Sequence, residues 1–271
     1  MWKVAGNSRR RVLQQALALS GLGLAGALGP LRAQDGIDVS LQRLVAANRI
    51  LANEGVVDAF GHVSIRDPRN PEQFIMSRSR SPALVESADF MDFTLDGEPV
   101  DARGRRPYGE RMIHAAIYEA RADVNSVVHH HAYAVLPFTI TDAPLRPVNH
   151  TASVIGAEIP VWDIRDEFGD TDLLVRDMEK GRDLANTLDD NTCLLMRGHG
   201  AVVVGPSVKH SVMTAVYLQV NAEIILDASQ LGEPRGLSDA EIELATATQF
   251  SPLGLDRAWE YFCSRAGVDP V

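Results

Sequence analysis

Three consecutive histidines, His129, His130 and His131, interrupt the stretch 126–135, which otherwise has the apolar composition of a buried strand. Alternate side chains of a strand share a face, so His129 and His131 point one way and His130 the other. Two imidazoles on one face can reach a single cation. We therefore predict that His129 and His131 bind a metal and that His130 packs on the opposite face.

A third ligand is expected from His199, which lies between Gly198 and Gly200 after another apolar stretch. Glycines let the backbone bend closely around a site. Three histidines leave one coordination position open, which is typical of a catalytic rather than a structural metal. We expect a divalent ion, with zinc first and manganese or iron as alternatives, because imidazole suits several metals. The competing interpretation is that one of these histidines is an ordinary core residue.

Glu110 is the candidate acid–base group. It lies at the start of a predicted helix, where a carboxylate is favoured by the helix dipole. His114, four residues later, should share its face and could orient it. The simpler alternative is an acid that only stabilises the helix N-terminus.

The surrounding chain predicts a single α/β domain. Apolar periodicity predicts helices over 39–53, 108–124, 173–190, 208–231 and 237–250, the last with a capping box from Ser238 to Glu241. Alternating or short apolar runs predict two strands in 60–82, a hairpin in 89–107 with Asp96-Gly97 at its turn, and extended structure in 125–140, 152–164 and 191–205. Because hairpins are evident and strict strand–helix alternation is not, we expect a largely antiparallel or mixed sheet covered by helices.

Residues 1–33 are predicted to be an export signal, and residues 34–271 the single domain. The segment has a basic start, an apolar run from 16 to 28 and a small residue, Ala33, before Gln34. The stretch 8–13, Ser-Arg-Arg-Arg-Val-Leu, fits the twin-arginine pattern. We expect a periplasmic or secreted protein; an arginine-rich ordinary secretion signal is the alternative.

Composition limits the partners. Without residues 1–33 the 26 basic residues fall to 21 against 36 acidic ones, a formal charge of −15. Such a field disfavours nucleic acid and anionic membranes and leaves a small molecule as the expected partner. Cys193 and Cys263 are too few and too far apart to form a disulfide framework.

Three stretches together resemble the class II aldolase/adducin family: "GHVSIR", "YGERMIHAAIYEARADVNSVVHHHA" and "LLMRGHGAVVVG". The resemblance runs from about residue 39 to 231. It implies a three-layer α/β/α fold and a homotetramer. It also implies that His129, His131 and His199 bind a divalent metal and that Glu110 is the acid–base carboxylate.

This sequence departs from the family pattern at positions that bind the substrate in phosphate-binding members. Where phosphate-binding members have small hydroxyl and backbone donors, this chain has Gly61-His62, Ser77-Arg78 and 107–109, Pro-Tyr-Gly. Guanidinium groups suit a carboxylate. A non-phosphorylated substrate is therefore expected, and the candidate substrate-binding residues are His62, Ser64, Ser77, Arg78, Arg80 and Tyr108.

The resemblance implies a metal-dependent carbon–carbon lyase acting on a hydroxy or oxo carboxylic acid, with decarboxylation, including that of an aromatic hydroxy acid, as the leading hypothesis. Retro-aldol cleavage of a hydroxy acid or sugar has the same electron flow. Two further hypotheses compete with a lyase: an Fe(II)-dependent oxygenase on the same three histidines, and a non-catalytic adducin-like interaction module.

Overall fold

The computed structural model describes residues 29–271. The predicted export signal lies outside the described residues except for 29–33, which open helix α1. Among residues 29–271, no helix has both the length and the apolar character that crossing a bilayer requires.

Eight α-helices are present in this part of the chain: α1 (Gly29–Asn53), α2 (Arg111–Ala120), α3 (Leu136–Thr139), α4 (Arg165–Phe168), α5 (Met178–Leu188), α6 (Val208–Ser229), α7 (Asp239–Gln249) and α8 (Pro252–Ala266). The strands are β1 (His62–Arg66), β2 (Gln73–Ser77), β3 (Phe90–Thr94), β4 (Ser126–His130), β5 (Val161–Trp162), β6 (Cys193–Met196) and β7 (Gly200–Gly205). Three short 3-10 helices complete the described set: η1 (Pro82–Leu84), η2 (Ser87–Asp89) and η3 (Thr151–Ile155).

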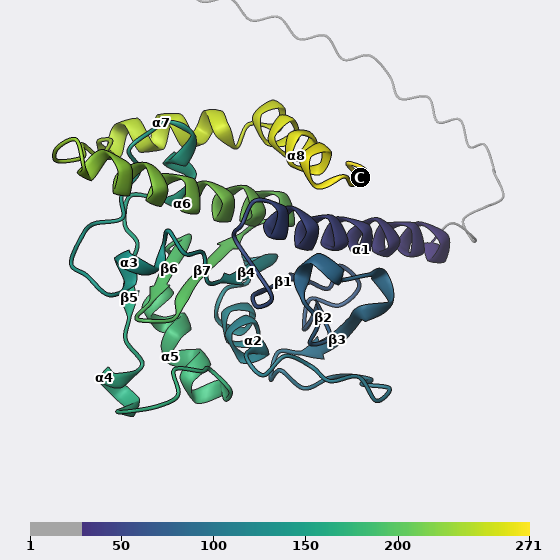
Figure 1. Ribbon diagram of the computed structural model, residues 1–271. Helices are drawn as coiled ribbons and strands as arrows, with labels where there is room; N and C mark the ends of the chain where they lie inside the picture. The colour runs from purple at the N-terminus through teal and green to yellow at the C-terminus, as the bar shows by residue number, and fades with distance from the viewer. Residues whose placement is uncertain (1–28) are drawn as a thin grey trace, which may run out of the picture.

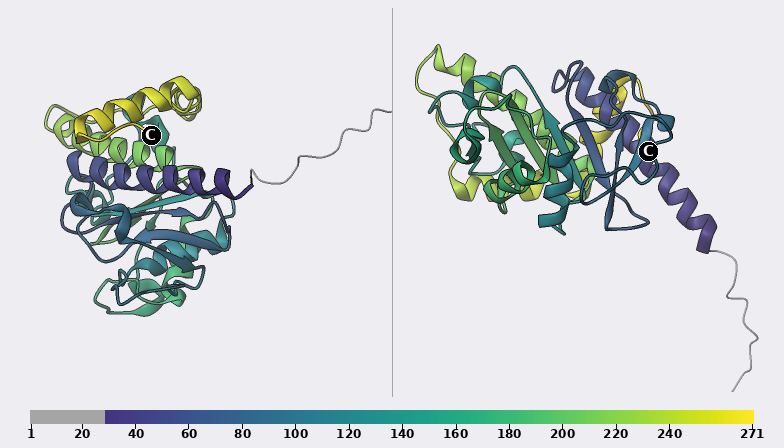
Figure 2. Two further views of the ribbon diagram at one scale, coloured as in Figure 1. Left: turned by 90° about the vertical axis from the view of Figure 1, so that its right-hand side faces the viewer. Right: turned by 90° about the horizontal axis from the view of Figure 1, so that it is seen from below.

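The strands form one sheet in the order β3-β2-β1-β4-β7-β6-β5. Every neighbouring pair is antiparallel except β5 and β6, which are parallel. The sheet is therefore mixed and mostly antiparallel, as the sequence predicts. Helices α1, α6, α7 and α8 lie on one face, and α2 and α5 lie on the other, which gives the three layers seen in Figures 1 and 2.

The two faces of β4 follow the alternation expected of a strand. Val128 belongs to the apolar core under α1, α6 and α8, whereas Val127 belongs to the core under α2 and α5. His129 shares the parity of Val127, and His130 shares that of Val128. The histidine run therefore sends one side chain into each face of the sheet, and His130 is completely buried on the side away from α2.

Four predicted elements are wrong in detail. The stretch 125–140, predicted to be extended, forms a strand only over β4 and then contains helix α3, and the helix predicted over 173–190 begins only with α5. The segment 152–164, predicted to be extended, begins as η3 against α6, and only Val161–Trp162 forms a strand. The predicted hairpin after β3 makes its turn at Gly97, but its return arm forms a single bridge, from Phe93 to Pro99. Its two hydrogen bonds, from the Thr94 N–H to the Glu98 carbonyl and from the Val100 N–H to the Asp92 carbonyl, join only the residues next to the turn.

Candidate metal centre

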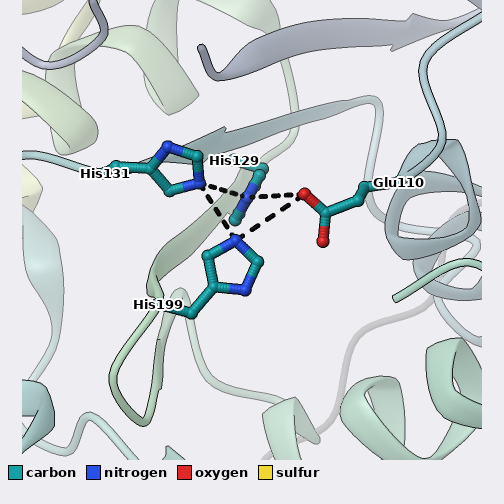
Figure 3. A group of neighbouring side chains, drawn as sticks. All are labelled: Glu110, His129, His131 and His199. Atoms are coloured by element: carbon teal, nitrogen blue, oxygen red, sulfur yellow. Dashed lines mark hydrogen bonds and ion pairs between the residues drawn. The ribbon is translucent and has the colours of Figure 1, made fainter. Parts of the chain in front are cut away.

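The imidazoles of His129, His131 and His199 converge on one point, as Figure 3 shows. The Nε2 atom of His131 lies 3.0 Å from that of His129 and 3.0 Å from that of His199. His129 is in β4, His131 follows its end, and His199 lies in the turn between β6 and β7. Because β4 and β7 are paired, the antiparallel ladder brings the two distant stretches together.

Backbone carbonyls orient two of the rings. Nδ1 of His129 is 3.1 Å from the carbonyl oxygen of Ala201, and Nδ1 of His199 is 2.9 Å from that of Leu173. A carbonyl can only accept, so each Nδ1 must carry the proton. Each Nε2 then presents its lone pair to the shared point, which is the tautomer that metal-binding histidines adopt.

Burial favours the neutral forms of His129 and His131. It is the largest cause that lowers the pKa of His129 well below its usual range, and the neighbouring His199 and His131 add to the effect. Burial and His199 lower the pKa of His131 to about 4. Neutral imidazole is the form that ligates metals.

The donor set fits a divalent metal. In a tetrahedral site with metal–nitrogen bonds near 2.1 Å, the ligand nitrogens lie about 3.4 Å apart. The observed 3.0 Å separations are close to that value, and one proton on His131 cannot satisfy the two lone pairs that face it. A bound cation would accept a lone pair from each of the three nitrogens, so the arrangement suits a metal ion.

Glu110 completes the cluster. Its Oε2 lies 3.7 Å from Nε2 of His129 and 3.6 Å from Nε2 of His199, while its Oε1 accepts a 3.0 Å hydrogen bond from the N–H of Val175. Burial raises the pKa of Glu110, with His199 and the Val175 N–H acting in the opposite direction. A raised carboxyl pKa suits a group that must both hold and release a proton.

His114 does not orient Glu110. Glu110 is the N-cap residue of α2 and turns toward the histidines, whereas His114 is buried and bonded to His62 and Ser64. The predicted pairing across one helical turn is therefore wrong, because the cap residue does not have the helical backbone geometry that would align it with the next turn.

The segment 173–177, which the sequence predicts to be helical, is instead a loop before α5. Its Leu173 carbonyl holds His199 and its Val175 N–H holds Glu110, so one short segment orients two members of the cluster. Leu173 has φ +65, in the left-handed region that is costly for a branched side chain. Both contacts use backbone atoms, which leave no signal in residue type.

Of the predicted substrate-binding residues, His62 lies nearest the cluster. Its ring centroid is 5.1 Å from that of His129 and 4.6 Å from that of Tyr108. Ser64 and Ser77 are fully or almost fully buried. The Tyr108 hydroxyl donates to the carbonyl oxygen of Arg80, so the tyrosine presents its ring, rather than its hydroxyl, to His62.

Arg78 and Arg80 are engaged by a carboxylate of the protein itself. Nε of Arg78 and Nη1 of Arg80 each lie 2.6 Å from an oxygen of the buried Asp89. These two ion pairs hold the loop after β2 in place, and each uses one nitrogen of the guanidinium group. Arg78 also lines an open groove with Arg105 and Arg106.

Replacing Asp89 by Asn should reduce the free energy of unfolding by about 1–2 kcal/mol, because two partly exposed arginines lose a charged acceptor. Burial alone would raise the pKa of Asp89, but the Glu86 N–H, Arg80 and Arg78 lower it overall. A carboxyl whose pKa is lower in the folded than in the unfolded protein stabilises the fold at pH values above its unfolded-state pKa. This stabilisation is lost as the pH falls through the folded-state pKa. The difference between parent and variant should therefore be constant near neutrality and shrink below about pH 4.

Urea denaturation at several pH values measures this difference. Asp101→Asn is the matched control, because Asp101 pairs with Arg103 at the surface, with 56% and 77% of the two side chains exposed. That pair should contribute little. Equal stability of the Asp89 variant and its parent at pH 7 would show that the loop does not depend on this contact.

Gly200 permits the close approach of β7 to the histidine run. A Cβ there would lie 2.2 Å from the carbonyl oxygen of His130 and 2.8 Å from Cδ2 of His131. Gly200→Ala should therefore cost about 1–3 kcal/mol of stability through overpacking. It should also weaken metal binding at least about tenfold by displacing His131.

Chelator competition measures the metal affinity of the Gly200 variant, and urea denaturation measures its stability. Gly36→Ala is the control, since nothing lies within 4 Å of that position; equally tight binding by both variants would contradict the account.

The chain belongs to the class II aldolase/adducin family. The family model described as the class II aldolase and adducin N-terminal domain matches residues 42–226. The chain is 37% identical to the decarboxylase tropJ of Talaromyces stipitatus, over 69% of this chain and 75% of that protein. It is 27% identical to a 3,4-dihydroxyphthalate decarboxylase of a Terrabacter species, over 83% of this chain and 97% of that protein.

Solved structures show the same fold. The L-fuculose 1-phosphate aldolase of Glaciozyma antarctica superposes with a TM-score of 0.72 at 21% identity, covering 92% of this chain and 94% of that one. An aldolase II superfamily protein of Pseudomonas syringae gives a TM-score of 0.71 at 20% identity, covering 88% of this chain and 94% of that one. The predicted family and the predicted α/β/α fold are thus confirmed. With decarboxylases among its relatives, the chain is an enzyme of the lyase class.

Proposed function

We propose that this protein is a metal-dependent decarboxylase of a non-phosphorylated hydroxy or oxo carboxylic acid, including aromatic hydroxy acids. The observation that carries the proposal is the convergence of three imidazoles, two of them oriented by backbone carbonyls, beside the raised-pKa carboxyl of Glu110. The similarity to tropJ and to the 3,4-dihydroxyphthalate decarboxylases supports the choice of reaction.

His129, His131 and His199 would hold the metal, most simply zinc, with manganese or iron as alternatives. When bound, such an ion supplies a Lewis acid that withdraws electron density from substrate oxygens.

Glu110 performs the proton transfer. When the carboxylate of the substrate leaves as CO2, the electron pair of the broken bond stays on carbon and must receive a proton. Oε2 of Glu110 faces the cluster, and the Val175 N–H fixes the other oxygen, so the proton is delivered from a defined direction. Burial raises the pKa of Glu110, which favours the protonated form of this carboxyl.

His62 is the protein group best placed to bind the departing carboxylate. Its ring lies next to that of His129, whereas Arg78 and Arg80 are paired with Asp89 and the Tyr108 hydroxyl is bonded to Arg80. Arg78 remains a candidate for a more distant carboxylate through its free N–H groups. Imidazole and phenol rings in place of small donors disfavour a phosphate at this position.

Retro-aldol cleavage is the second candidate, because the structural relatives include L-fuculose 1-phosphate aldolases. The discriminating experiment incubates zinc-, manganese- and iron-loaded protein with a panel of aromatic and aliphatic hydroxy acids. We expect CO2 without oxygen uptake. Release of an aldehyde would favour the aldolase, and metal-dependent oxygen consumption would favour the iron oxygenase. No reaction with any metal would favour an adducin-like interaction module.

We further propose that the enzyme is exported by the twin-arginine route and works as a homotetramer. The stretch 8–13 supports the first statement and family resemblance supports the second. Fractionation of cells that express the full chain tests export, with retention in the cytoplasm as the contrary result. Sedimentation of the purified protein tests the tetramer, and a monomer would contradict it.

A further inference from the structure

A buried chain of hydrogen bonds leads away from the metal centre beneath α2. Nδ1 of His62 lies 2.7 Å from Nε2 of His114, and Nδ1 of His114 lies 2.6 Å from Oγ of Ser64. Oγ of Ser64 lies 2.8 Å from the hydroxyl oxygen of Tyr118. All four side chains are at most 4% exposed. No step proposed above uses His114, Ser64 or Tyr118.

The far end of this chain determines its polarity. Within residues 29–271, the Tyr118 hydroxyl has one side-chain partner, Ser64. If Ser64 donated to Tyr118, the phenolic proton would be left buried without an acceptor, and an unsatisfied buried donor is costly. Tyr118 therefore donates to Ser64, and Ser64 in turn donates its own proton to Nδ1 of His114.

The positions of the ring protons on His114 and His62 follow from the direction of these hydrogen bonds. With Nδ1 of His114 accepting, its neutral ring carries the proton on Nε2 and donates it to Nδ1 of His62. His62 must then carry its own proton on Nε2. Within the described residues this atom has no hydrogen-bond partner, so its N–H remains available to an acceptor of a bound molecule.

Burial keeps the chain uncharged. It lowers the pKa of His114 to about 3 and raises that of Tyr118 above its usual range. Because neither ring gains or loses a proton near neutral pH, the direction of the hydrogen bonds is fixed by the fold.

We infer that Tyr118, Ser64 and His114 form a relay that holds His62 in the Nε2–H tautomer, so that His62 is a neutral hydrogen-bond donor dedicated to an acceptor oxygen of the substrate. His114 is thus a positioning residue, and the substrate must present an acceptor, such as a carboxylate, at this place. The inference depends on the proposed function for the identity of the substrate but not for the geometry of the relay.

A neutral donor suits loss of CO2. A guanidinium would stabilise the charged carboxylate of the ground state more than the nearly neutral group that departs, and such binding slows the chemical step. A neutral N–H of fixed direction also orients the carboxylate, but it stabilises the charged ground state less and therefore slows the chemical step less. The ion pairs of Arg78 and Arg80 with Asp89 are consistent with this division of roles.

The relay is tested by long-range proton–nitrogen NMR of the histidine rings in the zinc-loaded protein. We expect the proton of His62 on Nε2 and that of His114 on Nε2 in the parent. In His114→Phe, and in the milder Ser64→Ala, His62 should become a mixture of tautomers. His114→Gln retains one donor and one acceptor and should partly restore the parent state.

Activity gives a second readout. With bound metal unchanged, kcat/KM should fall about 10- to 100-fold in His114→Phe, the range for loss of an outer-shell partner, and less in Ser64→Ala. His210→Phe is the matched control: it removes a comparable contact, Nδ1 of His210 to Oγ of Ser207 at 2.8 Å, remote from the cluster, and should leave kcat/KM and the His62 tautomer unchanged.

A proton on Nδ1 of His62 in the parent protein would overturn the relay. So would an unchanged tautomer and unchanged kcat/KM in Ser64→Ala and in folded His114→Phe. If His62 has the expected tautomer but no hydroxy acid is turned over, the lyase proposal fails and the relay stands. If turnover is found with the other tautomer, the relay alone fails.

Discussion

Replacing His199 by Ala should remove most of the bound metal and abolish detectable turnover. His199 supplies one of three imidazole nitrogens, and its ring is fixed by the Leu173 carbonyl, so its removal leaves only two histidines and the Glu110 carboxyl at the cluster. Loss of an outer-shell partner already lowers metal affinity by up to about 100-fold, and loss of a ligand should exceed that. Metal content by elemental analysis and turnover of the best substrate measure the two effects.

His150→Ala is the control for this experiment, because His150 is exposed and lies outside the cluster. It should retain full metal and full activity. A His199→Ala protein that turned over substrate at the parental rate without metal would end the metal-dependent mechanism.

Replacing Glu110 by Gln should lower kcat by about 10²- to 10⁴-fold, the usual contribution of a positioned acid–base group. The amide oxygen can still accept from the Val175 N–H, so the side chain keeps its place but cannot transfer a proton. With three histidines present, the metal content should change little. Single-turnover kinetics on the metal-loaded variant measure the chemical step.

Glu167→Gln, at an exposed position, is the matched control and should behave as the parent does. Unchanged kcat in Glu110→Gln would show that another group transfers the proton. Loss of metal from this variant would instead identify Glu110 as an essential ligand.

The metal ligands could be predicted because strand geometry is regular. Period-two alternation places His129 and His131 on one side and His130 on the other without any knowledge of the rest of the fold. The structure adds that β4 ends at His130, so His131 reaches the cluster from just beyond the strand. His199 was predictable because glycines flank it and the backbone bends there.

Elements defined by long-range contacts were harder to predict. Val154 and Ile155 have the composition of a strand, yet they lie in η3, where they are buried against α6. Tertiary packing overrides local β preference in such a segment. The segment after Gly97 has the pattern of a hairpin arm, but it pairs with β3 through one bridge only.

The surroundings of the cluster were the least predictable part. Arg78 and Arg80 were expected to face a substrate, and their contacts to Asp89 arise because η2 brings that carboxylate back to the loop. His114 was assigned to the wrong partner because its contacts lie on β1, about 50 residues earlier in the chain. Side chains that bond across distant elements leave no periodic signal in sequence.

The most direct test of the central claim is anomalous diffraction from crystals of the metal-loaded protein, measured on both sides of the absorption edge of the metal found by elemental analysis. We predict one strong anomalous peak within about 2.3 Å of the Nε2 atoms of His129, His131 and His199. A peak elsewhere, or a stoichiometrically loaded protein whose three imidazoles bind no metal, would contradict the account.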